Sequence, residues 1–167
     1  ISKAFAATGV RVGWAVGPVD VIKRMSAILG HVGAWAPRAE QVATVQLLDD
    51  AQACADYHEG FLAGLSTRLR RLHEGFQAMK ASGLPVDSIP PMGAIYLTVH
   101  IAAFGKTTPT HQPLRSNEDI RKYLLDAARF GIVPFGAFGM AEAGQGWFRL
   151  SVGAVSEQDI IDALPRV

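Results

Sequence analysis

Residues 1–18 read ISKAFAATGVRVGWAVGP, a stretch of small residues and glycines that contains one lysine and one arginine. Within it, residues 10–16 (VRVGWAV) alternate in character and lie between Gly9 and the pair Gly17-Pro18. This pattern predicts a short β-strand bounded by turns. The chain starts at Ile1 with no initiator methionine, so we expect it to be part of a longer protein.

Lys3 and Arg11 are the chemically informative residues of this stretch. An ammonium in apolar surroundings is unfavourable, and a desolvated, partly neutral amine is a nucleophile that can form a Schiff base with an aldehyde. Arg11 alternates with Val10 and Val12, which predicts a buried guanidinium that needs an anion, and phosphate matches its bidentate geometry. From spacing alone, two strand-edge cations in ordinary salt bridges remain an alternative.

Composition excludes several classes of protein. The chain has 167 residues, 49% of them hydrophobic and 19% charged, which suits one globular domain. The 16 basic and 15 acidic residues nearly cancel, so we expect no nucleic-acid or membrane partner, and the basic run at 68–72 is interpreted as a solvated helix face. No signal peptide or membrane span is evident, which favours a cytoplasmic location.

The metal-ligating residue types do not cluster in the sequence. Cys54 is the single cysteine, which excludes an internal disulfide, and we interpret it as a buried inert thiol. The tetrapeptide HEGF occurs at His58 and at His73, on one face of a helical stretch, but neither histidine has a second ligand one turn away. We therefore predict no metal site.

The rest of the chain alternates between helical and extended patterns, which predicts a layered α/β fold. Proline, glycine and serine mark most boundaries, and the helical region 38–80 is long enough that we expect a break near residues 49–53. The predicted helices are 20–29, 38–80, 119–130 with a start at Ser116, and one from Ser156; the predicted strands lie within 92–101, 132–139 and 146–153.

Residues 2–18 (SKAFAATGVRVGWAVGP) resemble the lysine signature of the class I/II aminotransferases that depend on pyridoxal 5′-phosphate, the aspartate aminotransferase-like family of fold type I. Three later stretches are also similar to motifs of that family and occur in the family's order. They are PPMGAIYLTVHI (90–101), GIVPFGAFG (131–139) and WFRLSVG (147–153).

The resemblance implies roles for residues at the cofactor. Lys3 would form the Schiff base with pyridoxal 5′-phosphate and move the proton between substrate and cofactor. Arg11 would hold the cofactor phosphate, and Ser2 could add a hydroxyl near it.

On the substrate side, the resemblance implies that Arg149 clamps the α-carboxylate of the substrate through its planar guanidinium. Gly93 and Ile95 would line the substrate side of the site. An alternative for Arg149 is a strand arginine paired with an acid such as Glu142.

The resemblance also implies the domain organisation. Residues 1–30 would be the end of the larger cofactor-binding domain, 31–80 a long interdomain helical region, and 81–167 the small C-terminal α/β domain. The small domain would be a short, mainly antiparallel sheet packed by helices and preceded by a strand and a helix of the large domain. A homodimer is implied, and the loop from His31 to Trp35 could reach its partner or pack in the core.

The implied reaction is transfer of an amino group from an amino acid to a 2-oxo acid. A lyase of the same fold, a ligand-sensing domain of a transcriptional regulator, and a dimerising domain without catalysis are the alternatives. Because the family's larger domain supplies most cofactor contacts, we expect this chain alone to bind pyridoxal 5′-phosphate weakly or not at all.

Overall fold

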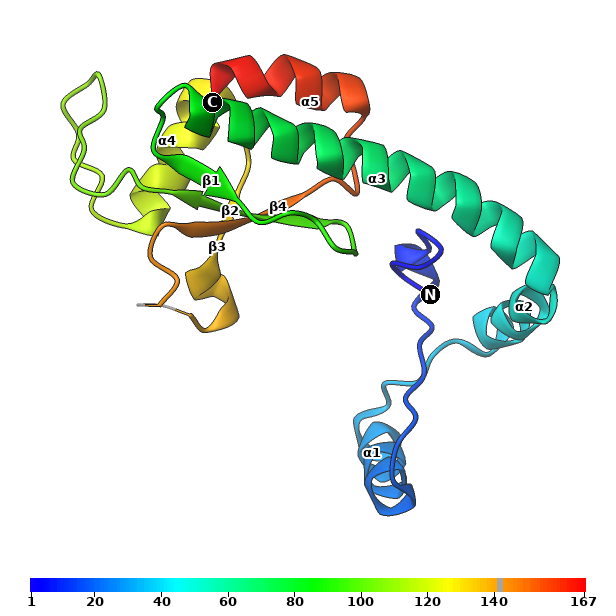
Figure 1. The fold of residues 1–167 in the computed structure, drawn as a ribbon. Helices are drawn as coiled ribbons and strands as arrows, with labels where there is room; N and C mark the ends of the chain where they lie inside the picture. Colours follow the sequence, from blue (N-terminus) through cyan, green and yellow to red (C-terminus); the bar gives the residue numbers. More distant parts are fainter. Residues whose placement is uncertain (141–142) are drawn as a thin grey trace. The chain divides into compact units, whose positions relative to one another are not determined.

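The computed structural model describes residues 1–140 and 143–167 (Figure 1). Its contacts divide the chain into two compact units, Ile1–Leu62 and Ala63–Val167. The three predicted segments, 1–30, 31–80 and 81–167, remain a prediction. The helices and strands are α1 Val19–Val32, α2 Arg38–Asp49, α3 Ala51–Ala81, β1 Val86–Ser88, β2 Tyr96–Ile101, α4 Asn117–Ala128, β3 Val133–Pro134, β4 Trp147–Ser151 and α5 Glu157–Ala163.

The first unit consists of an N-terminal loop, α1, α2 and the first part of α3. Pro18 precedes α1, and Gly33, with a left-handed φ of 71°, ends it. The predicted break in the long helical region is confirmed at Asp50, where the chain leaves α2. The Asp50 carboxylate then accepts a hydrogen bond of 2.9 Å from the amide of Ala53 in the first turn of α3.

The predicted strand at 10–16 is wrong. A short 3-10 helix covers Thr8–Val10, and the backbone is irregular from Arg11 to Pro18. Arg11 has a left-handed φ of 60° and an exposed side chain, so the expected buried guanidinium is also wrong. A strand needs a neighbouring backbone to complete its hydrogen bonds, and residues 1–62, all of them described, form no strand that could serve.

The second unit is built on a four-stranded antiparallel sheet in the order β1-β2-β4-β3, which confirms the predicted mixed α/β fold. In the central pair, Thr98 of β2 lies opposite Arg149 of β4. β1 spans only three residues and was not predicted, because a segment this short carries no readable alternation.

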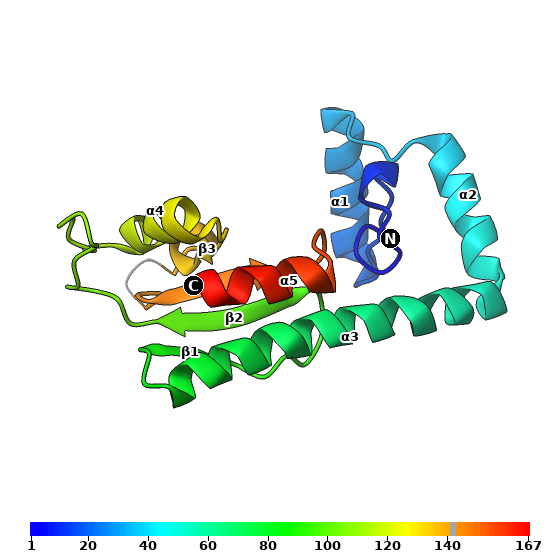
Figure 2. The same cartoon turned by 90° about the horizontal axis from the view of Figure 1, so that it is seen from above.

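The two faces of this sheet differ in their surroundings. Strand residues such as Leu97, Val99, Phe148 and Leu150 are buried. The helices α3, α4 and α5 lie along one side of the sheet (Figure 2), and the burial of alternate strand residues indicates that this is the side they face. These helices contribute Leu65, Leu69, Leu72, Phe76, Ile120, Leu124 and Ile160 to the same core.

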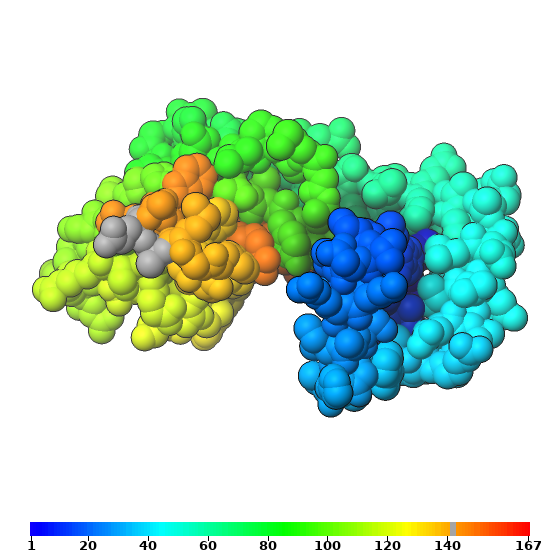
Figure 3. Space-filling view, turned by 90° about the horizontal axis from the view of Figure 1, so that it is seen from below, coloured from blue at the N-terminus to red at the C-terminus, as the bar shows by residue number. Residues whose placement is uncertain are grey.

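The opposite face of the sheet carries the alternate strand residues, which are only half-buried: Tyr96, Thr98, His100, Trp147 and Arg149. In Figure 3, which views the molecule from below, the gold and orange residues around the 3-10 helix Phe135–Phe138 (η2) and β4 lie beside one another on this side. Polar and aromatic side chains therefore remain available on this face.

The last two helices begin as the sequence predicts. The Ser116 hydroxyl accepts a hydrogen bond from the amide of Asp119 at the start of α4. Ser156 and Asp159 form a reciprocal capping box at the start of α5. No helix formed by the described residues has the length and apolar character needed to cross a bilayer.

Candidate functional site

The N-terminal loop, residues 1–12, closes on itself through polar contacts. The Thr8 hydroxyl donates a hydrogen bond of 3.2 Å to the carbonyl of Ser2, and Nη1 of Arg11 donates one of 2.9 Å to the carbonyl of Thr8. Ser2, Lys3 and Arg11, the three residues predicted to hold a cofactor, therefore lie on one small loop.

The side chain of Lys3 is exposed, which corrects the expectation of an apolar environment. The residues after it anchor the loop to α3. The ring of Phe5 stacks on Tyr57 with centroids 5.7 Å apart and packs against His58 at 4.6 Å. Nε2 of His58 lies 3.0 Å from the carbonyl oxygen of Ala4. These contacts fix the backbone next to Lys3, while its side chain stays exposed.

Arg149 lies in the middle of β4, on the face of the sheet away from the helices. Its guanidinium carbon is 4.1 Å from the ring centroid of Tyr96 and 4.3 Å from that of Phe138. Its Nε is buried and finds no hydrogen-bond acceptor among the described residues. A buried donor without an acceptor is costly, so this guanidinium is suited to an anion that approaches its free edge.

Neither Tyr96 nor Phe138 was among the predicted site residues. Tyr96 belongs to β2 and is two positions from Thr98, the partner of Arg149 in the ladder, so strand alternation puts Tyr96 and Arg149 on one face. Phe138 comes from η2, which is ended by Gly139 with φ 82°. The alternation in YLTVHI could have indicated Tyr96, but no local pattern indicates Phe138.

The predicted substrate-side residues Gly93 and Ile95 precede β2. Gly93 is exposed, and a Cβ at this position would meet no described atom within 4 Å. Ile95 is half-buried and its carbonyl accepts a hydrogen bond of 3.0 Å from the amide of Val152. Ile95 therefore lies at the same end of the β2-β4 pair as Tyr96, while Gly93 lies on the loop that leads to it.

Asn117 holds the turn that leads into β4. Its Nδ2 donates a hydrogen bond of 2.8 Å to the carbonyl of Gly144, and its Oδ1 accepts one of 2.8 Å from the amide of Gly146. Gly146 has φ 76°, and a Cβ there would lie 2.6 Å from Nε2 of His100. The turn therefore requires glycine at 146 and is fastened to the first residue of α4.

The two histidines of the HEGF repeats and the single cysteine make structural contacts. His73 contacts the hydroxyl of Ser88 at 2.7 Å, while His58 contacts the N-terminal loop, and the described residues contain no cluster of three or more potential metal ligands. Cys54 is half-buried, with Sγ 3.2 Å from the carbonyl of Leu47. Glu142, the alternative partner for Arg149, lies outside the described residues.

The basic run at 68–72 is used within the second unit. Nη1 of Arg68 donates a hydrogen bond of 2.8 Å to the carbonyl of Val155, and Arg71 forms an ion pair of 2.8 Å with Glu157. In the first unit, Trp35 is 62% exposed, which excludes a core position for it within this chain.

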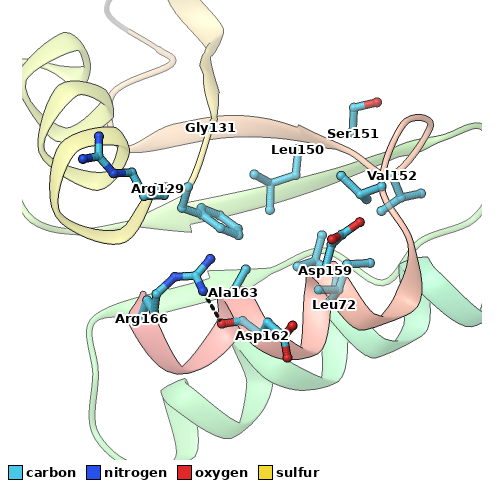
Figure 4. Close-up of a pocket in the computed structure, with 13 residues that line it drawn as sticks. Leu72, Arg129, Gly131, Leu150, Ser151, Val152, Asp159, Asp162, Ala163 and Arg166 are labelled. Carbon is cyan, nitrogen blue, oxygen red and sulfur yellow. Dashed lines mark hydrogen bonds between the residues drawn. The ribbon is translucent and has the colours of Figure 1, made fainter.

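A cavity of about 360 Å³ lies on the helix-covered side of the sheet (Figure 4). Its floor is apolar, with Phe130, Leu150 and Ile160 among the lining residues. Two of its polar side chains already have partners. Arg166 donates to the carbonyls of Ala128 and Asp162. The Asp159 carboxylate accepts from Ser156. The cavity is separate from Arg149, which points to the other face.

Comparison with known proteins gives a consistent result over the whole chain. Residues 1–167 match the family described as "Aminotransferase class I and II". The aspartate aminotransferase of Rhizobium meliloti (strain 1021) is 31% identical over 168 residues, which is 100% of this chain and 38% of that protein.

Solved structures show the same relationship. The crystal structure of the aspartate aminotransferase from Rhizobium meliloti aligns with a TM-score of 0.78 and 31% identity over 99% of this chain and 38% of that one. An aspartate aminotransferase from Thermus thermophilus with maleate aligns with a TM-score of 0.78 and 29% identity, over 98% of this chain and 38% of that one. The chain therefore spans less than two-fifths of the length of the relatives it matches.

Proposed function

Because the chain belongs to the aminotransferase class I and II family, we propose that the complete protein transfers an amino group from an amino acid to a 2-oxo acid, with pyridoxal 5′-phosphate as its cofactor. The observation that carries the proposal is the state of Arg149. Its buried Nε lacks a hydrogen-bond acceptor among the described residues. An amino acid and a 2-oxo acid share the carboxylate that such a guanidinium binds.

The residues of the N-terminal loop fit the cofactor. Lys3 offers an exposed amine, and Arg11 offers an exposed guanidinium whose Nη1 donates to the carbonyl of Thr8. Both lie on one closed loop with the hydroxyl of Ser2 nearby in sequence. An amine can form a Schiff base with an aldehyde, and a guanidinium can bind a phosphate.

When bound, pyridoxal 5′-phosphate supplies an aldehyde carbon and an electron-accepting ring for the transfer. In the proposed mechanism Arg11 would hold the phosphate, and Ser2 would add a hydrogen bond to it. Nζ of Lys3 accepts the proton from the substrate Cα as a general base and returns it later as a general acid. Arg149 binds the α-carboxylate of the substrate, which orients the Cα–H bond for cleavage. Gly93 and Ile95 line the substrate side.

The named relatives favour transfer over the other reactions of this fold. The curated relatives named above are aspartate aminotransferases, so we propose aspartate as the first amino donor to test and an oxo acid as acceptor. A lyase of the same fold or an aminotransferase-like sensor domain is not favoured by any of these names.

We further propose a cytoplasmic homodimer. Large apolar side chains in the first unit are exposed in this chain, including Trp14 (64%), Val16 (93%) and Val32 (70%). Exposed apolar surface of this kind is suited to packing against further protein.

The test uses the complete protein with pyridoxal 5′-phosphate. We expect a visible absorption band that aspartate shifts and a 2-oxo acid restores, and we expect Lys3→Ala to lose both the band and the transfer. Lys23→Ala, on the exposed surface of α1, is the matched control and should behave as the parent. A parent protein with a band but no transfer from any donor would favour the sensor, and a band that persists in Lys3→Ala would disprove the role of Lys3.

A further inference from the structure

Two aromatic rings contact the guanidinium of Arg149, and each comes from a different element. Tyr96 is the first residue of β2, and Phe138 is the last residue of η2. Their ring centroids lie 4.1 and 4.3 Å from the guanidinium carbon, well inside the range of about 6 Å at which a ring attracts a cation. Among the described residues, Arg149 is therefore held by packing against π faces and not by an acid.

Packing against rings does not use the N–H groups of the Arg149 guanidinium. A ring contributes no lone-pair acceptor, whereas a carboxylate partner would occupy the N–H groups and neutralise the charge. No described residue forms an ion pair or hydrogen bond with the Arg149 side chain. The cation is therefore oriented before an anion arrives.

The two rings are themselves fixed. Backbone pairing of β2 with β4 sets the position of Tyr96, because Thr98 pairs with Arg149 and Tyr96 with Ser151. Phe138 packs edge-on against Phe135, with centroids 6.0 Å apart and planes at 87°. The rings therefore limit the rotamers that Arg149 can adopt.

We propose that Tyr96 and Phe138 are positioning residues that hold the Arg149 guanidinium ready for a substrate carboxylate. The inference rests on the proposed function for the identity of that carboxylate. A preordered arginine loses less side-chain entropy when the substrate binds, so the rings strengthen binding in the ground state and in the transition state alike. Uniform binding of this kind affects KM and leaves kcat nearly unchanged.

The kinetic test compares variants of the complete protein with its cofactor in the amino-donor half-reaction. We expect Phe138→Leu and Tyr96→Leu each to raise the KM for the donor about 5- to 30-fold, with kcat changed by less than about twofold. Phe138→Tyr keeps a ring and should restore the parent KM. Phe138 is 46% exposed, so its replacement should leave the fold intact.

Trp147→Leu is the matched control. Trp147 lies on the same sheet face, but its ring packs on His100 with centroids 4.8 Å apart, whereas the guanidinium of Arg149 lies over the rings of Tyr96 and Phe138. It should leave KM unchanged. The inference is overturned if Phe138→Leu keeps the parent KM, if its loss falls on kcat alone, or if Trp147→Leu raises KM equally.

A second measurement needs no catalysis and so separates this inference from the proposed function. In this chain with labelled arginine, the side-chain NMR signals of Arg149, assigned from their loss in Arg149→Lys, should show ring-current shielding. Phe138→Leu should reduce that shielding and Trp147→Leu should not. If the parent protein fails to transfer amino groups but the shielding is present, the proposed function fails and the positioning of Arg149 stands; signals that do not move in Phe138→Leu overturn the positioning.

Discussion

At the scale of single residues, Arg149 and Asp87 differ in how many hydrogen-bond partners their charged groups have. No described residue accepts a hydrogen bond from Nε of Arg149, whereas the Asp87 carboxylate accepts from three neighbours. Its Oδ2 pairs with Lys80, and its Oδ1 accepts 3.0 Å from Gln77 and 2.8 Å from the amide of Ser88. These bonds, that from Lys80 first, hold the pKa of Asp87 far below its usual value. Asp87 is thus a structural carboxylate that joins α3 to β1.

Asp87 should make the stability of the fold depend on pH. The pKa of Asp87 is lower in the folded than in the unfolded chain, so its stabilisation is complete above about pH 4 and is lost as the pH falls below that value. We expect Asp87→Asn to flatten the fall in unfolding free energy between about pH 4 and pH 2, as measured by urea denaturation. The pair is solvent-exposed, so the difference should be small.

Asp126→Asn is the control for that experiment. It removes the same charge from α4, where the carboxylate accepts no hydrogen bond from a described residue. A slope in Asp87→Asn equal to that of the parent would contradict the structural role of Asp87.

Residue chemistry was only partly predictable from the sequence. Arg149 stands out because a strand arginine in FRLS needs a partner, and the resemblance supplied its role. Phe138 could not be found in this way. Its contact with Arg149 depends on the turn geometry of η2, which brings residues 11 positions apart together through tertiary structure alone.

At the scale of elements, local signals predicted the helices well. The proline before α1, the break at Asp50 and the serine caps of α4 and α5 all lie where the sequence places them. Caps and glycine or proline stops act within one turn, so a single sequence contains them. The strand predicted at 10–16 failed for the opposite reason, since pairing depends on a backbone elsewhere.

The cap of α5 provides the second prediction. Ser156 accepts 3.1 Å from the amide of Asp159, whose carboxylate accepts from the Ser156 amide and hydroxyl in return. These bonds lower the pKa of Asp159. Because α5 has only seven residues, loss of its cap should matter. We expect Ser156→Ala to lower the unfolding free energy by about 1 kcal/mol in chemical denaturation.

Ser156→Thr retains a hydroxyl that can cap the helix and should recover most of this loss. The loss should also be accompanied by faster amide exchange in α5. An unchanged midpoint in Ser156→Ala would show that the remaining contacts of α5, such as buried Ile160, hold the helix without its cap.

At the scale of the whole molecule, the two units differ in how much they bury. Of residues 1–62, all described, only Val12 and Thr44 are buried. The second unit contains a continuous core, with Phe76, Val99 and Phe148 at 0% exposure. Most of the apolar burial that stabilises a fold is therefore in the second unit.

The third prediction follows from this difference. In the 167-residue chain, we expect backbone amides of β2 and β4 to exchange slowly with deuterium and those of α1 to exchange fast. Helices that bury little apolar surface open at low cost. Mass spectrometry of peptides that cover Val19–Val32 and Tyr96–Ile101 makes the comparison. Equal protection of the two segments would contradict it.

The two-residue alternation of β4 has a further consequence, which concerns chain length. Leu150 enters the core and Arg149 faces away from it, so deleting one residue between Trp147 and Arg149 would exchange these environments and bring a cation into contact with the helices. Substitutions on the exposed side of β4 are compatible with the fold, but changes in its length are not. The loop after β2, at 102–116, has no such alternation to preserve, but buried Leu114 and the helix cap at Ser116 restrict changes of length to its exposed part.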